Sequence, residues 1–93
     1  MKMRAASRLG TTQEVAIGAV SAASAAFGPQ TYQVRVVATS ACRVRIGDGT
    51  PAALAADSYL PADRPEYFTC TPGQRIAVIQ ESAGGKLSVT EVV

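Results

Sequence analysis

The sequence predicts an all-β protein, a small antiparallel β-sandwich or barrel of six to seven strands with an extended N-terminal arm. Three observations lead to this prediction. Apolar and polar residues alternate with a period of two in several short runs between residues 31 and 92, as they do in half-buried strands. Glycine, proline and aspartate residues that favour turns separate these runs. The 93 residues suffice for one small domain, and no stretch is long enough to link two domains.

The chain divides into an arm, residues 1–12, and a β-domain, residues 13–93. The arm carries Lys2, Arg4 and Arg8 but few large apolar side chains. Such a segment buries too little apolar surface to order itself. We therefore expect it to be extended and to dock against another subunit rather than its own domain, which makes its three basic residues candidate interface residues.

The first strand of the domain is expected within residues 12–27, with a bend at residues 21–24. The alanines of this segment favour helix. The β-branched Val15 and Ile17, together with Gly18, favour an extended chain instead.

The central stretch, residues 31–47, reads TYQVRVVATSACRVRIG. Its alternation predicts two antiparallel strands joined by a tight reversal at residues 38–41. Pairing of these strands would place Arg35, Arg43 and Arg45 on one face. Three guanidinium groups on one face repel each other unless they are paired, so we expect contacts with carboxylates of a neighbouring chain. A solvated face that limits aggregation is the alternative.

The remaining strands are expected at residues 59–60, 66–71, 75–81 and 87–92. The third of them is apolar on both phases, which predicts a central strand covered on both sides. Residues 71–74, Thr-Pro-Gly-Gln, fit a type II turn with glycine at the third position. Residues 82–85 are expected to form a hairpin, and AALAAD at 52–57 a surface loop or a single helical turn.

The composition argues against an enzyme, a cofactor site or a metal site. The chain has no histidine, so neither an imidazole base for a nucleophile nor an imidazole metal ligand is present. Gly47-Asp48-Gly49 lacks the Gly-Lys-Ser/Thr of a phosphate-binding loop. Cys42 and Cys70 could form a disulfide, but Cys42 falls on the apolar phase of its strand, which favours a buried free thiol.

Charge and hydropathy also restrict the partners. The net charge is +2, yet from Leu9 onward six basic side chains stand against seven acidic ones. Because the folded part is near neutral, the sequence argues against a nucleic-acid partner. No run approaches the roughly 18 apolar residues of a membrane span, so no membrane partner is expected.

Six short elements follow one another in a loose succession: Thr-Tyr-x-Val-Arg-Val (31–36), Ala-Thr-Ser-Ala-Cys-x-Val-x-Ile-Gly (38–47), Leu-Pro-Ala (60–62), Pro-Glu-Tyr-Phe (65–68), Pro-Gly-Gln-Arg-Ile-Ala-Val-Ile-Gln (72–80) and Gly-Lys-Leu-Ser-Val-Thr-Glu (85–91). In their order and spacing they resemble a group of small proteins encoded by tailed bacteriophages and prophages. The resemblance covers about two-thirds of the chain, from Phe27 to Val93.

This resemblance implies a non-enzymatic virion structural protein, with capsid decoration (cement) as the favoured role. Its partners would be the major capsid protein or another virion protein, and it would be one of many copies in a particle assembled in the host cytoplasm. A tail or head–tail connector component is the nearest alternative. A receptor- or glycan-binding β-module would need exposed aromatic side chains at a loop rim, for which Tyr59 and Tyr67 are candidates. A small nucleic-acid-binding barrel is a further alternative.

Overall fold

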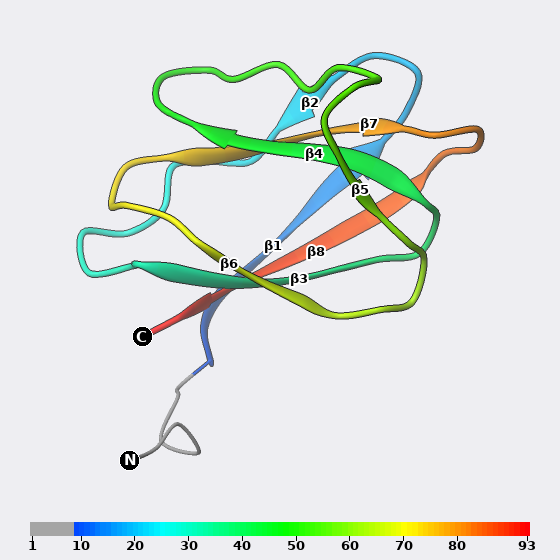
Figure 1. Cartoon of the computed structure of the whole chain (residues 1–93). Coiled ribbons are helices and arrows are strands. Elements are labelled where there is room, and N and C mark those ends of the chain that lie inside the picture. The colour runs from blue at the N-terminus through cyan, green and yellow to red at the C-terminus, as the bar shows by residue number, and fades with distance from the viewer. Residues whose placement is uncertain (1–8) are drawn as a thin grey trace.

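The computed structural model describes residues 9–93 as two four-stranded antiparallel sheets, and this range contains no helix (Figure 1). The strands are β1 (Leu9–Ile17), β2 (Ala22–Ala23), β3 (Gln33–Ala38), β4 (Cys42–Gly47), β5 (Ser58–Leu60), β6 (Glu66–Thr69), β7 (Arg75–Gln80) and β8 (Gly85–Val92). Sheet A has the strand order β1-β8-β3-β6, and sheet B has the order β2-β7-β4-β5.

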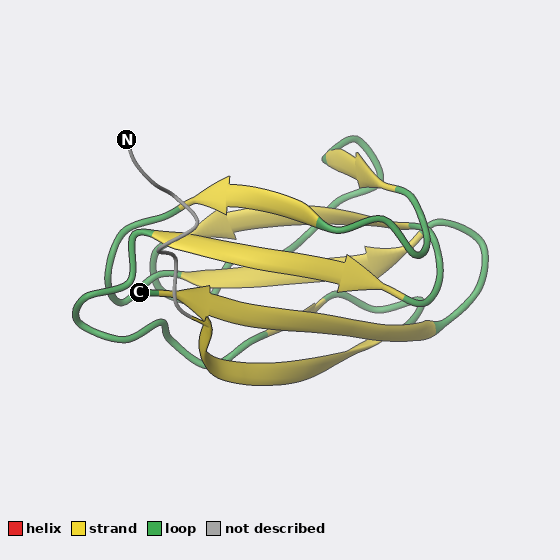
Figure 2. Ribbon diagram, turned by 90° about the horizontal axis from the view of Figure 1, so that it is seen from below, coloured by secondary structure: helices red, strands yellow, loops and turns green. Residues whose placement is uncertain are grey.

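The two sheets lie in layers, with β4 and β7 of sheet B above β3 and β8 of sheet A (Figure 1), and loops connect the strands at both ends (Figure 2). The predicted all-β sandwich is therefore confirmed. The described part of the chain holds eight strands rather than six or seven. The alanine-rich segment expected to be one bent strand forms two, because β1 pairs with β8 in sheet A while β2 pairs with β7 in sheet B.

Inward-facing side chains of both sheets form the core. Residues 0–1% exposed include Val34 and Val36 on β3, and Leu87 and Val89 on β8. The other buried apolar side chains of this cluster are Val15, Ile17, Phe27, Ala38, Cys42, Val44, Leu60, Cys70, Ile76 and Val78. Strand β7 lies between β2 and β4 and buries three consecutive residues, as expected for a central strand covered on both sides.

Successive strands alternate between the sheets, except that β4 and β5 are neighbours in sheet B. The predicted pairing of β3 with β4 is therefore wrong. Residues 39–41 form a corner that crosses from sheet A to sheet B. Thr39 N–H donates to Lys86 O at the start of β8 at 2.9 Å, and Ser40 Oγ donates to Gly84 O in the β7–β8 connection at 2.7 Å. The predicted hairpin at residues 82–85 is likewise a corner, from β7 in sheet B to β8 in sheet A. Both errors have one cause, since a period of two fixes which face is buried but not which strand is the neighbour.

The turn at residues 71–74 was predicted correctly. Gln74 N–H donates to Thr71 O at 3.2 Å, and Gly73 has a φ of 86°. A positive φ at this position is the defining feature of a type II turn and is readily adopted only by glycine.

The boundary of the expected arm is wrong by four residues. Strand β1 begins at Leu9, which is opposite Val92, and Thr12 is opposite Thr90. These residues gain order from main-chain pairing with β8, which needs no large apolar side chains. The predicted docking of Lys2, Arg4 and Arg8 lies outside the described residues.

The two long sides of the sandwich differ. On the side of β1 and β2, the Gln13 amide bridges the sheets, because its Oε1 accepts from Ala25 N–H at 2.8 Å and its Nε2 donates to Ala25 O at 3.3 Å. On the other side the sheets end in β5 and β6, which have three and four residues. We call this second side the open side.

Candidate functional site

The three arginines of the central stretch do not share a face, contrary to prediction. Arg35 lies between the buried Val34 and Val36 and therefore projects from the outer face of sheet A. Arg43 and Arg45 flank the buried Val44 and project from the outer face of sheet B. Because β3 and β4 belong to different sheets, the expected three-arginine face does not form, and any interface role of these residues stays a prediction.

Arg43 has partners within its own chain. Its Nε donates to Glu81 Oε1 at 2.9 Å, and its Nη1 donates to Asp57 O at 3.3 Å. The guanidinium carbon also lies 4.9 Å from the centre of the Tyr59 ring, within cation–π range. Arg43 thus stabilises the edge of sheet B and does not need a carboxylate from a neighbour.

Arg45 is paired with Asp57. Its Nε and Nη2 donate to Asp57 Oδ1 at 3.1 and 2.9 Å, while Leu54 N–H donates to Asp57 Oδ2 at 2.7 Å. The bond from Leu54 and then the bond from Arg45 lower the pKa of Asp57, because both favour the ionised carboxylate. The pair fixes the end of the long β4–β5 loop against β4.

Arg35 differs from the other two. It is directly opposite Tyr67 of β6 and Thr90 of β8, and within residues 9–93 no carboxylate forms an ion pair with it. Of the three arginines, Arg35 is the one whose surroundings leave it available to a partner.

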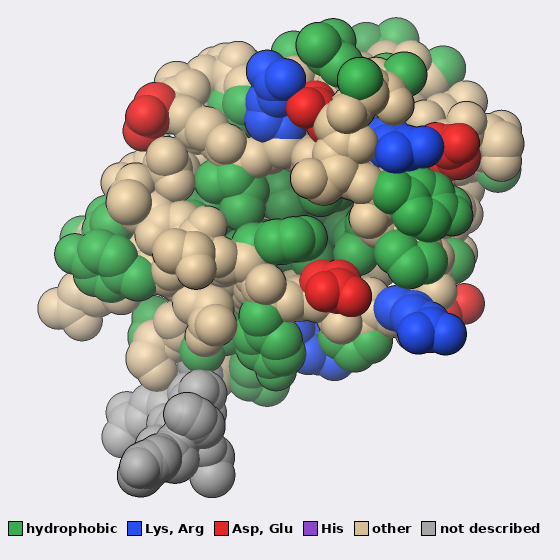
Figure 3. All heavy atoms as spheres, in the orientation of Figure 1, with side chains coloured by type: hydrophobic (Ala, Val, Ile, Leu, Met, Phe, Trp, Pro, Cys, Tyr) green, Lys and Arg blue, Asp and Glu red, His purple; other side chains and the backbone are tan. Residues whose placement is uncertain are grey.

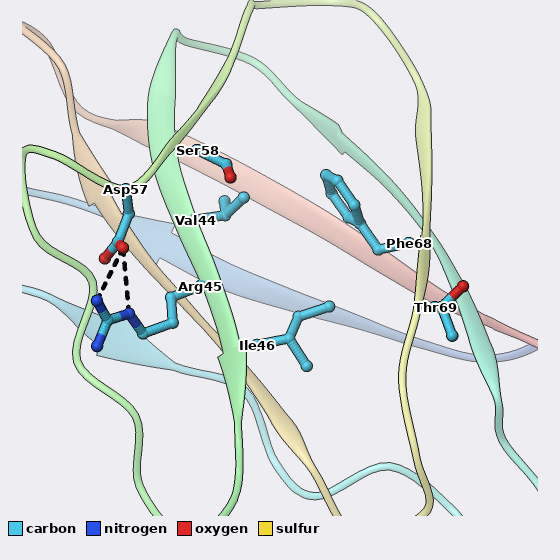
Figure 4. A pocket seen from close by; sticks show the side chains of 7 residues that line it. All are labelled: Val44, Arg45, Ile46, Asp57, Ser58, Phe68 and Thr69. Carbon is cyan, nitrogen blue, oxygen red and sulfur yellow. Dashed lines mark hydrogen bonds and ion pairs between the residues drawn. The ribbon is translucent and has the colours of Figure 1, made fainter.

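A pocket of about 300 Å³ lies on the open side (Figure 4). Its lining is formed by Val44, Arg45, Ile46, Asp57, Ser58, Phe68 and Thr69. Ile46 of β4 and Phe68 of β6 point into the space between their strands, whereas the Arg45–Asp57 pair lies on the side of β4 away from Phe68 (Figure 4). On this side of the molecule, hydrophobic side chains occupy a hollow between the sheets and charged side chains surround it (Figure 3).

Main-chain groups of β6 face the open side without a strand partner. Cys70 N–H donates to Tyr32 O at 2.9 Å, which sets the phase of the ladder between β6 and β3. Since alternate residues of an antiparallel strand bond to the same neighbour, Phe68 directs its N–H and C=O to β3. Tyr67 and Thr69 direct theirs away from β3, and β6 is the edge of its sheet.

Strand β4, on the other side of the pocket, also has main-chain groups without a strand partner. Glu81 N–H donates to Ala41 O at 3.2 Å, so odd-numbered residues of β4 bond to β7 and even-numbered ones face β5. The pairing with β5 ends at Val44 and Ser58. Ile46 therefore directs its main-chain groups toward the pocket, beyond the last residue pair of β5.

The sequence analysis missed this pocket. One signal was available, because Phe68 falls on the inward phase of β6, opposite the buried Val34. The signal is weak, since the pocket exists only because β5 is too short to cover the second half of β4. That length depends on how the ten residues between β4 and β5 fold, which no pattern in the sequence revealed.

The two candidate aromatic side chains for glycan binding do not gather at one rim. Tyr59 is opposite Arg43 on the outer face of sheet B, and Tyr67 is opposite Arg35 on the outer face of sheet A. Both are about half exposed, but they lie on opposite faces of the sandwich. The arrangement gives no aromatic platform for a sugar ring.

Both cysteines are buried free thiols, and the expected burial of Cys42 is confirmed. Burial raises the pKa of Cys42 to about 11. Burial, followed by the nearby Glu91 carboxylate, also raises the pKa of Cys70. Thiols in this state are protonated at neutral pH and are poor nucleophiles.

Residues 9–93 contain no group of three or more His, Cys, Asp or Glu side chains that could hold a metal ion. Nor does that part of the chain include a helix with the length and hydropathy needed to cross a bilayer.

Comparisons of the chain with models of protein families, with curated proteins and with solved structures find no match. The expected resemblance to phage proteins has no support from these comparisons.

Proposed function

We propose that this chain is a non-enzymatic structural protein of a tailed-bacteriophage virion, and specifically a capsid decoration protein that reinforces the head shell. Its contacts would be with the major capsid protein or another virion protein. The observation that carries the proposal is the open side, where two strand edges with unpaired main-chain groups flank an apolar pocket.

Such a surface is better suited to protein binding than to catalysis. Exposed strand edges are templates for pairing with another chain, and a half-buried aromatic side chain beside them offers apolar area to a partner. The two charged residues that line the pocket already neutralise each other, since Arg45 forms an ion pair with Asp57.

The small core is consistent with a role inside an assembly. The one phenylalanine buried below one-tenth exposure is Phe27, and the largest side chains that are fully buried are Leu60, Ile76 and Leu87. A domain of this size buries only about 60–65% of its unfolded surface. Contacts repeated around a shell would add stability that the isolated chain lacks.

Copy number in purified virions tests the proposal. We expect the chain to be present at a stoichiometry comparable to that of the major capsid protein, as measured by quantitative mass spectrometry. Particles assembled without it should bind the added protein and should then release their DNA at a higher temperature. A stoichiometry more than about tenfold lower would instead indicate a tail or connector position, and absence from purified virions would rule out the proposal.

A further inference from the structure

We infer that the open side binds an extended segment of a partner protein by strand addition to β6. This segment carries an apolar residue and a Lys or Arg that are two positions apart, in either order. The inference deepens the proposed function, on which it rests, by assigning the contact surface and the chemistry of the partner.

Strand β6 has main-chain groups to which an added strand can bond. Tyr67 and Thr69 each present an N–H and a C=O to the open side. An added strand satisfies such groups in pairs, because residues of an antiparallel or parallel neighbour meet them at every second position. The main-chain groups of Ile46 on β4 lie across the pocket from β6, on the other side of the space that the segment would occupy.

The pocket beside Phe68 can hold the apolar residue of the segment. A strand added beside β6 directs alternate side chains to the same face as Phe68. That face opens into the pocket of about 300 Å³ between Phe68, Ile46 and Val44. A leucine-sized side chain fits this volume and would cover the exposed part of Phe68.

Glu66 of β6 provides the negative charge that would select a basic residue. Glu66 is opposite the buried Val36, so it lies on the same face of β6 as Phe68, two residues away. It is exposed, and no cationic group of residues 9–93 forms an ion pair with it. A carboxylate at this place on an edge strand repels acidic or purely apolar strands and selects a basic side chain two residues from the apolar one.

A titration with synthetic peptides tests this inference directly. The probe is a soluble peptide rich in Thr and Ser in which Leu and Lys lie two residues apart, and the matched control peptide has Glu in place of Lys. We expect the Lys peptide to shift the NMR amide signals of Tyr67 and Thr69 in the full-length protein, and to bind at least about threefold more tightly than the Glu peptide. No shift at these two amides up to millimolar peptide, or equal binding of both peptides, would overturn the inference.

Two pairs of variants separate strand addition from general loss of structure. Thr69→Pro removes an N–H that faces away from β3 but leaves the hydrogen bonds of β6 to β3 in place. Ala16→Pro is its control on β1, where the main-chain groups of even-numbered residues likewise face away from β8. We expect Thr69→Pro to weaken peptide binding about tenfold and Ala16→Pro to leave it within about twofold. Glu66→Lys should abolish the preference for the Lys peptide, whereas Asp48→Lys, at an exposed turn, should retain it.

The same variants distinguish this inference from the proposed function. If Thr69→Pro enters virions at the normal copy number, the open side is not the contact surface, while the virion role stands. If the full chain forms a dimer in sedimentation experiments that Thr69→Pro dissociates, the occupant is a second copy and the partner assigned here is wrong.

Discussion

Gly84 lies where two corners of the sandwich touch. A Cβ placed on it would be 2.8 Å from the main-chain oxygen of Ile17, which is too close for any real contact and cannot be relieved by moving a side chain. Gly18, near the end of β1, has no atom within 4 Å of the corresponding position. The two glycines therefore form a matched pair for substitution by alanine.

We predict that Gly84→Ala lowers the free energy of unfolding by about 1–3 kcal/mol, the usual cost of overpacking. Gly18→Ala should change it little or raise it by about 0.4–1 kcal/mol, because alanine restricts the unfolded chain. Chemical denaturation of both variants measures the difference. Equal stability of the two would mean that the corner at residues 82–85 does not approach Ile17 at the end of β1 as described.

The Asp57 carboxylate links stability to pH. Its pKa is lowered in the folded protein from an ordinary value of 3.8, first by the Leu54 N–H and then by Arg45. Its stabilising contribution is therefore complete above the ordinary value and is lost as the pH falls through the lower, folded value. We predict that Asp57→Asn melts at a lower temperature than the natural chain at pH 7 and that the difference shrinks toward pH 2–3. A difference that is constant over this range would show that Asp57 acts without its charge.

Glu91 shows how a polar residue can belong to the interior. It lies on the inward phase of β8, opposite Val34, and is 8% exposed. Its Oε1 accepts hydrogen bonds from Thr31 Oγ1 and from Gly28 N–H. The carboxylate thus fastens the turn between β2 and β3 to the end of the core. Its phase with Leu87 and Val89 was visible in the sequence, but the partners 60 or more residues away were not.

At the scale of strands, the alternation of apolar and polar residues correctly predicted which side chains are buried, but it did not predict which strands are neighbours. Val34 and Val36, and likewise Ile76 and Val78, are buried as the pattern required. The same pattern suits a hairpin and a crossing between sheets, because in both cases the apolar side chains point toward the core. Only contacts remote in sequence, such as Thr39 with Lys86, decide between them. This is why the arginine face was predicted and does not exist, and why the pocket at the open side was not predicted.

Strand β1 offers a test of the corrected boundary at the N-terminus. Removing residues 1–12 deletes the pairs that Leu9 and Thr12 form with β8, including the 3.0 Å hydrogen bond between Thr12 Oγ1 and Thr90 Oγ1. Removing residues 1–8 deletes none of them. We predict that the shorter truncation melts about 5–10 °C above the longer one, since a few hydrogen bonds are worth about 1–2 kcal/mol and a small domain shifts by about 4–8 °C per kcal/mol. Identical melting temperatures would show that β1 contributes to stability only from Gln13 onward.

At the scale of the whole molecule, Leu9 and Val92 are paired across sheet A. The two ends of the described chain are therefore neighbours, and a short glycine–serine linker can join Val93 to Leu9 without crossing the sandwich. The long connection between β4 and β5 supplies a place for new ends, at the exposed Gly49 and Thr50.

We predict that this circular permutant folds to the same structure. It should show the same β-type circular dichroism as the chain truncated by residues 1–8, with a melting temperature lower by less than about 10 °C, because the ends are opened in an exposed loop. A permutant opened within β7, between Val78 and Ile79, is the control and should not fold, since β7 is central in sheet B. Failure of the first permutant with intact solubility would contradict the pairing of β1 with β8.

The position of β8 between β1 and β3 also bears on how the protein is made in the cell. A ribosome delivers strands in order, and β8 is the last of them. Until it emerges, β1 and β3 have no common neighbour, and β1 has no partner at all in sheet A. Sheet A therefore cannot form before β8 has left the ribosome.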